Sequence, residues 1–84
     1  RLGRGSPLVY RLLSDAALKA GKKAATHRYR GEMRYAQGDL EPAILQMRLA
    51  LKTPGIGFHE ASEIQVRLDA LEDEQEQEKT KELL

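Results

Sequence analysis

The sequence predicts an all-α fold of about four helices arranged as antiparallel hairpins. Apolar residues recur at spacings of three and four along most of the chain, which is the periodicity of a helix with one buried face. Gly21 and Gly38 lie 17 residues apart, and each follows one such periodic segment. The turns between these segments are about two to five residues long, and turns this short force neighbouring helices to run antiparallel.

The first helix is expected over residues 8–20. Residues 1–6 are rich in glycine and arginine and are expected to form a linker or a disordered start. Ser6 is a favourable N-cap residue, and Pro7 suits the first helical position. Leu12 and Leu13 follow helical spacing and are predicted to lie in the core, and Gly21 is expected to end the helix in a left-handed conformation.

The second helix is expected over residues 22–37. Its apolar row is weaker and is interrupted by Gly31, which costs about 1 kcal/mol relative to alanine inside a helix. A glycine at such a position usually marks the close approach of another helix. Gly38 is expected to close this second helix.

The third helix begins after Asp39, a predicted cap, and ends at the sequence TPGIG over residues 53–57. A fourth helix is expected to begin near Phe58. The predicted core residues of these two helices are Ile44, Met47, Ile64 and Leu68. Residues 72–84 begin with eleven residues that carry no apolar side chain, and they are expected to form a solvated helical extension or a disordered tail.

The glycine spacing of 17 residues is half of the roughly 34-residue period of tetratricopeptide (TPR) repeats. With Gly38 as the turn glycine, Gly31 and Ala43 fall on the small positions of that pattern, and Met47 falls on the large apolar position. Residues 7–71 therefore resemble a TPR-like α-solenoid. Arg34 and His27 depart from the pattern, because larger apolar residues are common at these positions.

The same residues also show a more specific similarity. The segments YRLLSDA, GDL and AILQMRLAL occur in an order similar to that in the C-terminal TPR-like domain of bacterial HExxH zinc metallopeptidases (the BepA-like, β-barrel assembly-enhancing protease family). The resemblance implies a periplasmic location and a catalytic domain N-terminal to this segment. It also implies that the helical array contacts the substrate or the outer-membrane assembly machinery.

Length and composition limit the possible classes of protein. Eighty-four residues suffice for one small domain, and the lack of cysteine excludes disulfides and thiolate metal sites. No apolar run approaches the length of a membrane span, so no direct membrane insertion is expected. No signal peptide is visible, and a chain that starts at Arg1 is expected to be a fragment of a longer protein.

The net charge of +1 conceals a strong asymmetry along the chain. Residues 1–34 carry nine basic side chains against two acidic ones, whereas residues 60–84 carry nine acidic side chains against three basic ones. The two ends are therefore expected to attract one another, either within one molecule or between neighbouring molecules.

No catalytic, cofactor-binding or metal-binding residue is predicted in this chain. His59 and Glu60 begin an HExxH motif, but residue 63 is glutamate, and a catalytic zinc site needs three protein ligands. His27 is the only other histidine and is expected at or near the surface. The chain itself is therefore not expected to be an enzyme, and zinc is expected only in the parent protease.

The candidate peptide-contacting residues are Arg28, Glu32 and Tyr35, which the TPR register places on the concave face of the array. The alternative is an ordinary solvated helix face. A nucleic-acid site is the weaker reading: Tyr29 and Tyr35 interleave with basic residues of the second helix, but the domain is nearly neutral and lacks a nucleic-acid motif.

These observations predict a protein–protein interaction domain that binds a protein or peptide. The resemblance implies the non-catalytic C-terminal segment of a periplasmic zinc metalloprotease that acts in outer-membrane protein quality control. The alternative is a generic TPR scaffold of a cytoplasmic complex with no protease attached. Exposed terminal helices are expected to permit self-association into a homo-oligomer.

Overall fold

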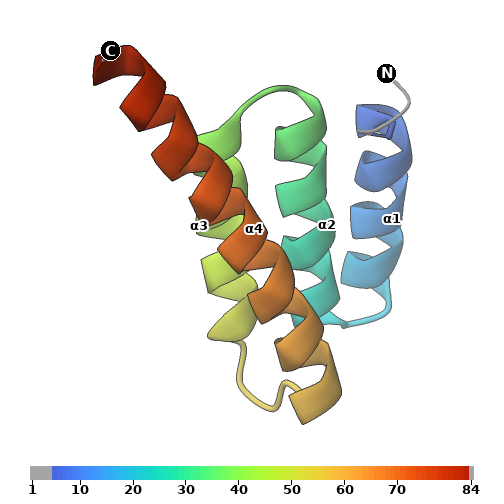
Figure 1. Cartoon of the computed structure of the whole chain (residues 1–84). Helices are drawn as coiled ribbons and strands as arrows, with labels where there is room; N and C mark the ends of the chain where they lie inside the picture. The colour runs from blue at the N-terminus through green and yellow to red at the C-terminus, as the bar shows by residue number, and fades with distance from the viewer. Residues whose placement is uncertain (1–4, 84) are drawn as a thin grey trace.

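The computed structural model describes residues 5–83 and contains four α-helices joined by short turns (Figure 1). The helices are α1 (Pro7–Lys19), α2 (Lys23–Ala36), α3 (Leu40–Leu51) and α4 (Phe58–Leu83). The predicted all-α fold of about four helices in antiparallel hairpins is confirmed.

The two predicted turn glycines end their helices as expected. Gly21 and Gly38 have φ angles of 75° and 86°, in the left-handed region that glycine enters without steric cost. In both turns the next residue bonds back into the last helical turn: the amide of Lys22 donates to the carbonyl of Ala17, and the amide of Asp39 donates to the carbonyl of Arg34, each at 2.9 Å. This hydrogen-bond pattern reverses the chain within three residues.

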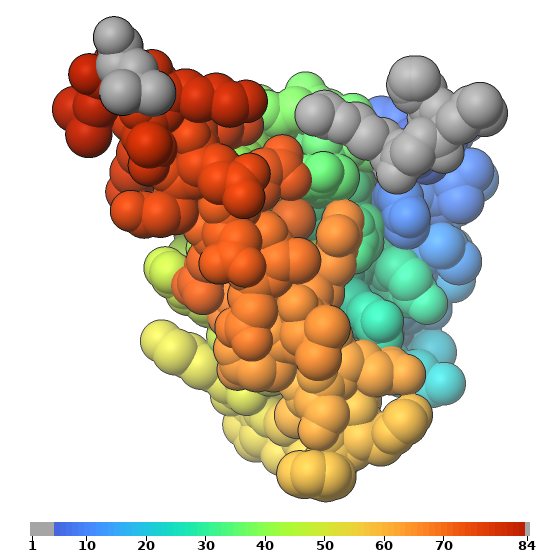
Figure 2. Space-filling view, in the orientation of Figure 1, coloured from blue at the N-terminus to red at the C-terminus, as the bar shows by residue number. Residues whose placement is uncertain are grey.

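The helices pack in chain order: α1 on α2, α2 on α3 and α3 on α4. Figure 1 shows α1, α2 and α3 side by side, with α4 crossing in front of α2 and α3. The space-filling view shows α2 between α1 and α4 (Figure 2). The helices α1 and α4 therefore form two outer surfaces of the molecule.

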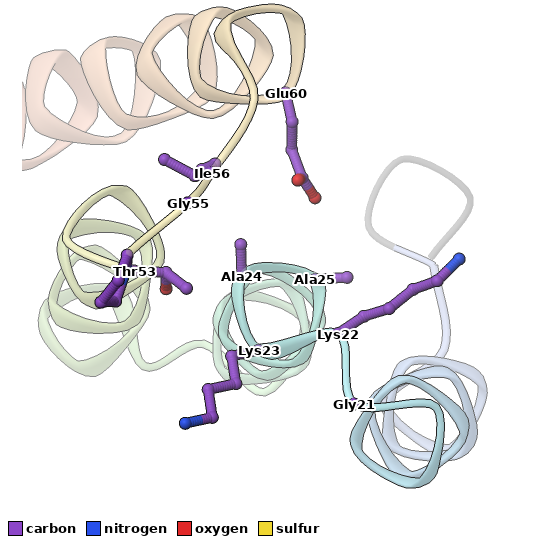
Figure 3. A pocket seen from close by; sticks show the side chains of 10 residues that line it. Gly21, Lys22, Lys23, Ala24, Ala25, Thr53, Gly55, Ile56 and Glu60 are labelled. Atoms are coloured by element: carbon purple, nitrogen blue, oxygen red, sulfur yellow. The ribbon is translucent and has the colours of Figure 1, made fainter.

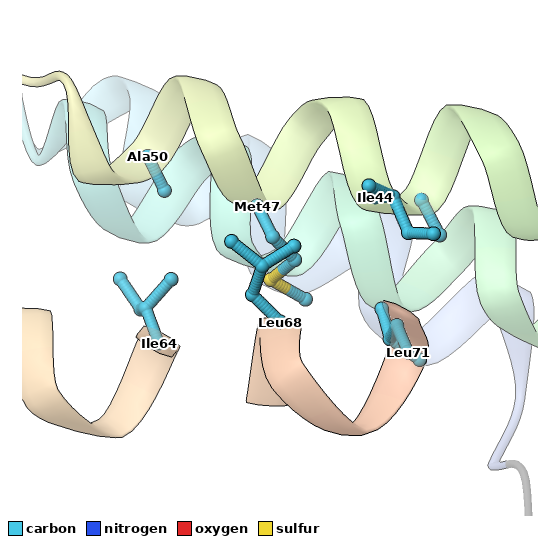
Figure 4. Packing of buried hydrophobic residues seen from close by; sticks show 7 residues of the cluster. Ile44, Met47, Ala50, Ile64, Leu68 and Leu71 are labelled. Atoms are coloured by element: carbon cyan, nitrogen blue, oxygen red, sulfur yellow. The ribbon is translucent and has the colours of Figure 1, made fainter. Parts of the chain in front are cut away.

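The hydrophobic core lies mainly between α3 and α4 (Figure 4). Its largest fully buried side chains are Met47, Ile64 and Leu71. Ile44 and Leu68 are also buried, at 2% and 5% exposure, so the core predictions for α3 and α4 are confirmed. The i, i+3 and i+4 spacing of these residues forms one continuous apolar row on each helix.

Gly31 allows α2 and α3 to approach closely, as the sequence predicted. A Cβ atom at residue 31 would lie 2.9 Å from Met47 Cε and 3.2 Å from the Ala43 carbonyl oxygen. Both distances are shorter than an ordinary van der Waals contact, so only glycine fits at this position without movement of its neighbours.

The prediction that Leu12 and Leu13 lie in the core is wrong. Their side chains are 59% and 39% exposed. The buried side of α1 is instead formed by Ser14 and Ala17, two small residues that let α1 lie close to α2. Ser14 is satisfied within its own helix because its hydroxyl donates to the Arg11 carbonyl at 2.9 Å.

Ser6 and Asp39 occupy the predicted N-cap positions, but neither side chain forms a capping hydrogen bond. Their backbone carbonyls accept the first helical bonds, from the amides of Tyr10 and Ala43. The two residues therefore mark the helix starts without contributing the side-chain stabilisation that was expected of them.

The charged segment after Leu71 continues α4 as a helix to Leu83. Leu71 is the last buried residue of α4, and the helix makes polar contacts beyond it. Arg48 of α3 pairs with Glu72 at 2.7 Å. Of the two alternatives predicted for this segment, the described residues show the helical extension.

Candidate functional site

The three candidate peptide-contacting residues lie on one face of α2, and that face is turned toward α4. Arg28, Glu32 and Tyr35 are spaced by four and three residues, which places them in one row. All three side chains are partly buried. Each side chain reaches a polar residue of α4.

The strongest of these contacts joins Glu32 to Arg67. The Nε and Nη2 atoms of Arg67 donate to the two carboxylate oxygens of Glu32 at 2.7 and 2.9 Å. This two-point geometry matches the planar guanidinium group to the planar carboxylate. Arg28 pairs with Glu63 at 3.2 Å, one helical turn before Arg67 on α4.

Tyr35 extends the same set of contacts toward the C-terminal half of α4. Its hydroxyl donates to Glu74 Oε1 at 3.0 Å. The guanidinium carbon of Arg67 lies 4.8 Å from the centre of the Tyr35 ring, within the range of a cation–π interaction. Arg67 therefore contacts both Glu32 and Tyr35.

We refer to these six residues as the α2–α4 polar cluster: Arg28, Glu32 and Tyr35 of α2, with Glu63, Arg67 and Glu74 of α4. Glu32 is more buried than Arg28, Glu63 or Arg67, with 16% of its side chain exposed. The pKa of Arg67 is raised above its ordinary value, mainly by its hydrogen bond to Glu32, and burial opposes this rise. The ion pair therefore outweighs the desolvation of the guanidinium group.

The cluster changes how the three predicted contact residues are interpreted. Each already has a partner on α4. Together these contacts join α2 to α4 along the length of the two helices, which run in the same direction. A peptide that used them would have to exchange these intramolecular contacts for its own. Peptide contact by Arg28, Glu32 and Tyr35 stays a prediction, whereas their structural role is visible in the geometry.

The two histidines lie apart from one another. His27 Nδ1 lies 2.9 Å from Gln46 Oε1, which joins α2 to α3. His59 is at the start of α4 and lies 3.3 Å from Glu63, four residues later on the same helix. Within residues 5–83, no group of three or more histidine, aspartate or glutamate side chains is arranged to hold a metal ion.

The α2 N-terminus and the α3–α4 loop border a hollow of about 450 Å³ (Figure 3). Glu60 points toward this hollow, whereas the side chains of Lys22 and Lys23 extend away from it. The other lining residues are small or apolar, such as Ala24 and Ile56. The hollow therefore lacks the converging polar groups that orient a small ligand.

A second hollow, of about 490 Å³, lies between the first half of α3 and the extension of α4. Pro42, Ile44 and Leu45 form its apolar part. Arg48 and Lys79 are among its polar lining residues, and Arg48 is already paired with Glu72. This hollow is open and shallow compared with an enclosed ligand pocket.

The largest departure from the sequence prediction is an exposed apolar surface on α1. We call it the α1 outer face. Its residues recur at spacings of three and four and share one side of the helix. They are Leu8, Val9, Leu12, Leu13 and Ala16. Periodicity indicated that Leu12 and Leu13 belong to an apolar row, but it could not show whether that row faced the core or the solvent.

Among residues 5–83, no helix combines the length and apolarity that a membrane span requires. Comparison of the chain with protein-family models, with curated proteins and with solved structures gave no match.

Proposed function

We propose that this chain is a non-catalytic protein–protein interaction module and that the α1 outer face is its main contact surface. One observation carries this proposal: Leu8, Val9 and Leu12 are 51–60% exposed on a single side of α1. Single exposed leucines are common on soluble proteins. A contiguous apolar face of this kind is typical of a surface that another protein covers.

The rest of the structure is consistent with a binding role. The polar side chains of the α2–α4 polar cluster bond to one another and hold two helices together. The two hollows are open, and their polar residues do not converge on one point. The outer face of α1 is the described surface with the most exposed apolar side chains.

The finer proposal is that the module belongs to a TPR-like array. The close approach at Gly31, Ala43 and Met47 supports it, because the pattern requires small residues facing one large apolar side chain. The resemblance of residues 7–71 supports a place in a periplasmic zinc metallopeptidase that acts on outer-membrane proteins. The alternative parent is a cytoplasmic scaffold without a protease.

The coding sequence upstream of residue 1 distinguishes the two parents. The protease proposal requires an HExxH motif and an export signal there. If both are missing, the protease proposal is wrong, and the scaffold becomes the better description. Neither result affects the proposed role of α1.

Site-specific photocrosslinking tests the proposed contact surface directly. A photoreactive amino acid is placed at Leu12 in the full parent protein and, as the matched control, at Leu18. Leu18 is similarly exposed, at 54% compared with 59%. It lies six residues further along α1, which is about 240° around the helix.

Irradiation in the native host is expected to give discrete protein adducts from residue 12 and few from residue 18. Adducts of equal yield from both positions, or none from residue 12, would contradict the proposal. The mass of an adduct also distinguishes a second copy of the chain from a different protein.

A further inference from the structure

The structure presents two outer surfaces of opposite charge, and we propose that they bind one another between copies of the chain. In this head-to-tail contact, the α1 outer face of one molecule packs against the exposed side of α4 of the next. The inference goes beyond the proposed interaction role because it names both surfaces and the partner.

The second surface is a strip on the solvent side of α4, which we call the α4 outer face. Val66 and Ala70 form its apolar part, and Val66 is 70% exposed. Asp69 and Asp73 lie three residues after Val66 and Ala70, and therefore on the same side of the helix. Phe58, at the start of α4, is 88% exposed.

The charges around the two faces are complementary. Residues 7–23, which contain α1 and the turn after it, carry four basic side chains and one acidic side chain. Arg11, Asp15 and Lys19 lie beside the α1 outer face, all three are exposed, and together they give it a net positive charge. The α4 outer face carries Asp69 and Asp73, both exposed, whereas Glu63 and Glu72 of α4 already pair with Arg28 and Arg48 within the chain.

This charge distribution decides between the possible pairings. A contact between two α1 helices would bring two basic surfaces together, and a contact between two α4 helices would bring two acidic surfaces together. Like charges at an interface disfavour association, whereas opposite charges favour it and speed encounter. The pairing of α1 with α4 is the one that brings surfaces of opposite charge together.

The two faces lie on two different outer helices of one molecule. Because α2 lies between α1 and α4, the pairing is made with a neighbouring copy (Figure 2). The basic residue Arg28 and the acidic residue Glu63 already meet inside the molecule. The charges of α1 are not drawn into that cluster and remain available at the surface.

A head-to-tail contact does not close on itself, so each added copy leaves one free α1 face and one free α4 face. The mass of the assembly is therefore expected to rise steadily with protein concentration. The contact involves one helix face from each copy, which is small for a protein interface, so the association is expected to be weak and to require high protein concentration. Because the contact is partly ionic, added salt should weaken it.

Sedimentation of the full chain and of two charge-introducing variants tests the proposal. Leu12→Glu places a negative charge on the α1 face, and Val66→Lys places a positive charge on the α4 face. Both positions are exposed, so both variants are expected to fold, which circular dichroism checks. Leu18→Glu is the matched control on the other side of α1.

Each of the two face variants alone should remain monomeric where the wild-type chain associates. Their equimolar mixture should regain association, because the intact α1 of one variant meets the intact α4 of the other. The Leu18→Glu variant should behave as the wild-type chain does.

Three results would overturn the proposal. Association of Val66→Lys alone at the wild-type level would show that α1 pairs with α1. Association of Leu12→Glu alone would show that α4 pairs with α4. A wild-type chain that stays monomeric throughout would show that the α1 and α4 outer faces do not bind one another.

Discussion

Arg67 of α4 holds Glu32 of α2 through two hydrogen bonds, of 2.7 and 2.9 Å, although the two residues are 35 positions apart. This pair joins two helices that share little apolar contact, since α4 packs mainly on α3. It therefore fixes the position of α4 relative to α2.

Replacing Glu32 with glutamine should lower the free energy of unfolding by about 1–2 kcal/mol, because Arg67 would lose a charged partner in a half-buried site. Urea denaturation of both proteins measures the change. Glu76→Gln makes the same chemical change at an exposed position of α4 and should alter stability by less than about 0.5 kcal/mol. Equal effects of the two substitutions would contradict the role assigned to Glu32.

Arg67→Lys should make stability sensitive to alkaline pH. The folded-state pKa of Arg67 is raised, so its contribution is fully present below the ordinary pKa of arginine and is lost only as pH rises through the higher folded value. A lysine titrates near pH 10.4 and would lose its charge earlier. The stability difference between the variant and the wild-type chain should therefore widen as pH rises above about 10.

A difference that stays constant over that pH range would show that the charge of residue 67 does not stabilise the fold. Denaturant unfolding at several pH values supplies the measurement. The comparison is made between the two proteins at each pH, so that effects of pH common to both cancel.

Gly31→Ala should destabilise the fold by up to about 2 kcal/mol, which is the difference between the overpacking cost and the gain in helix propensity. Alanine gains about 1 kcal/mol in helix propensity. However, its Cβ would lie 2.9 Å from Met47 Cε and 3.2 Å from the carbonyl oxygen of Ala43, and such overpacking costs about 1–3 kcal/mol. Thermal denaturation of the variant measures the net effect.

Gly57→Ala is the matched control for this substitution, because an added Cβ there meets no atom within 4 Å. The double variant Gly31→Ala/Met47→Leu removes the atom nearest to the new methyl group. It should be more stable than the sum of the two single changes predicts. Purely additive effects would mean that residues 31 and 47 do not compete for the same space.

Met47→Ala should lower stability by about 2–5 kcal/mol, because the side chain is fully buried and its removal leaves a cavity. Leu12→Ala should cost less than about 0.5 kcal/mol, because that side chain is 59% exposed. Chemical denaturation at low protein concentration measures the loss of stability in each variant. A large loss for Leu12→Ala would place α1 in the core, as the sequence alone suggested.

Tyr35→Phe removes the hydrogen bond to Glu74 and keeps the ring beneath Arg67. The loss should be about 0.5–1.5 kcal/mol and should concentrate in the extension of α4. Hydrogen exchange should therefore become faster over residues 72–80 than over α1. Uniform acceleration along all four helices would contradict a local role for this bond.

The helices and the α3–α4 core could be predicted from the sequence because they depend on local rules. The spacing of Ile44, Met47, Ile64 and Leu68 defines two apolar rows, and glycine at residues 21 and 38 ends helices by conformational freedom. These signals need no knowledge of the tertiary arrangement. The structure confirmed them for that reason.

The direction in which α1 faces could not be predicted in the same way. Leu12 and Leu13 form a regular apolar row, but Ser14 and Ala17 form a competing small-residue side, and close packing on α2 uses that side. Periodicity shows that a row exists and leaves open what covers it. The packing of α1 against α2 determines which side of α1 is buried.

The sequence contains a charge pattern that indicates the α2–α4 polar cluster, although no single residue of the cluster indicates it. Arg28 and Glu32 are four residues apart on α2, and Glu63 and Arg67 are four apart on α4 in the opposite charge order. Two helices that run in the same direction bring these pairs into register. Matching complementary charge spacings between helices would have identified the contact.

The accessibility of the α1 outer face tests the central claim most directly. The chain contains no cysteine, so single cysteines at residues 12, 17 and 18 can be compared by their rates of maleimide labelling. In dilute protein, residues 12 and 18 should react quickly and residue 17 slowly, because Ala17 is buried. An excess of unlabelled wild-type chain should then slow labelling at residue 12 and leave residue 18 unchanged. Labelling at residue 12 as slow as at residue 17 in dilute protein, or equal rates at residues 12 and 18 with the excess present, would contradict the account.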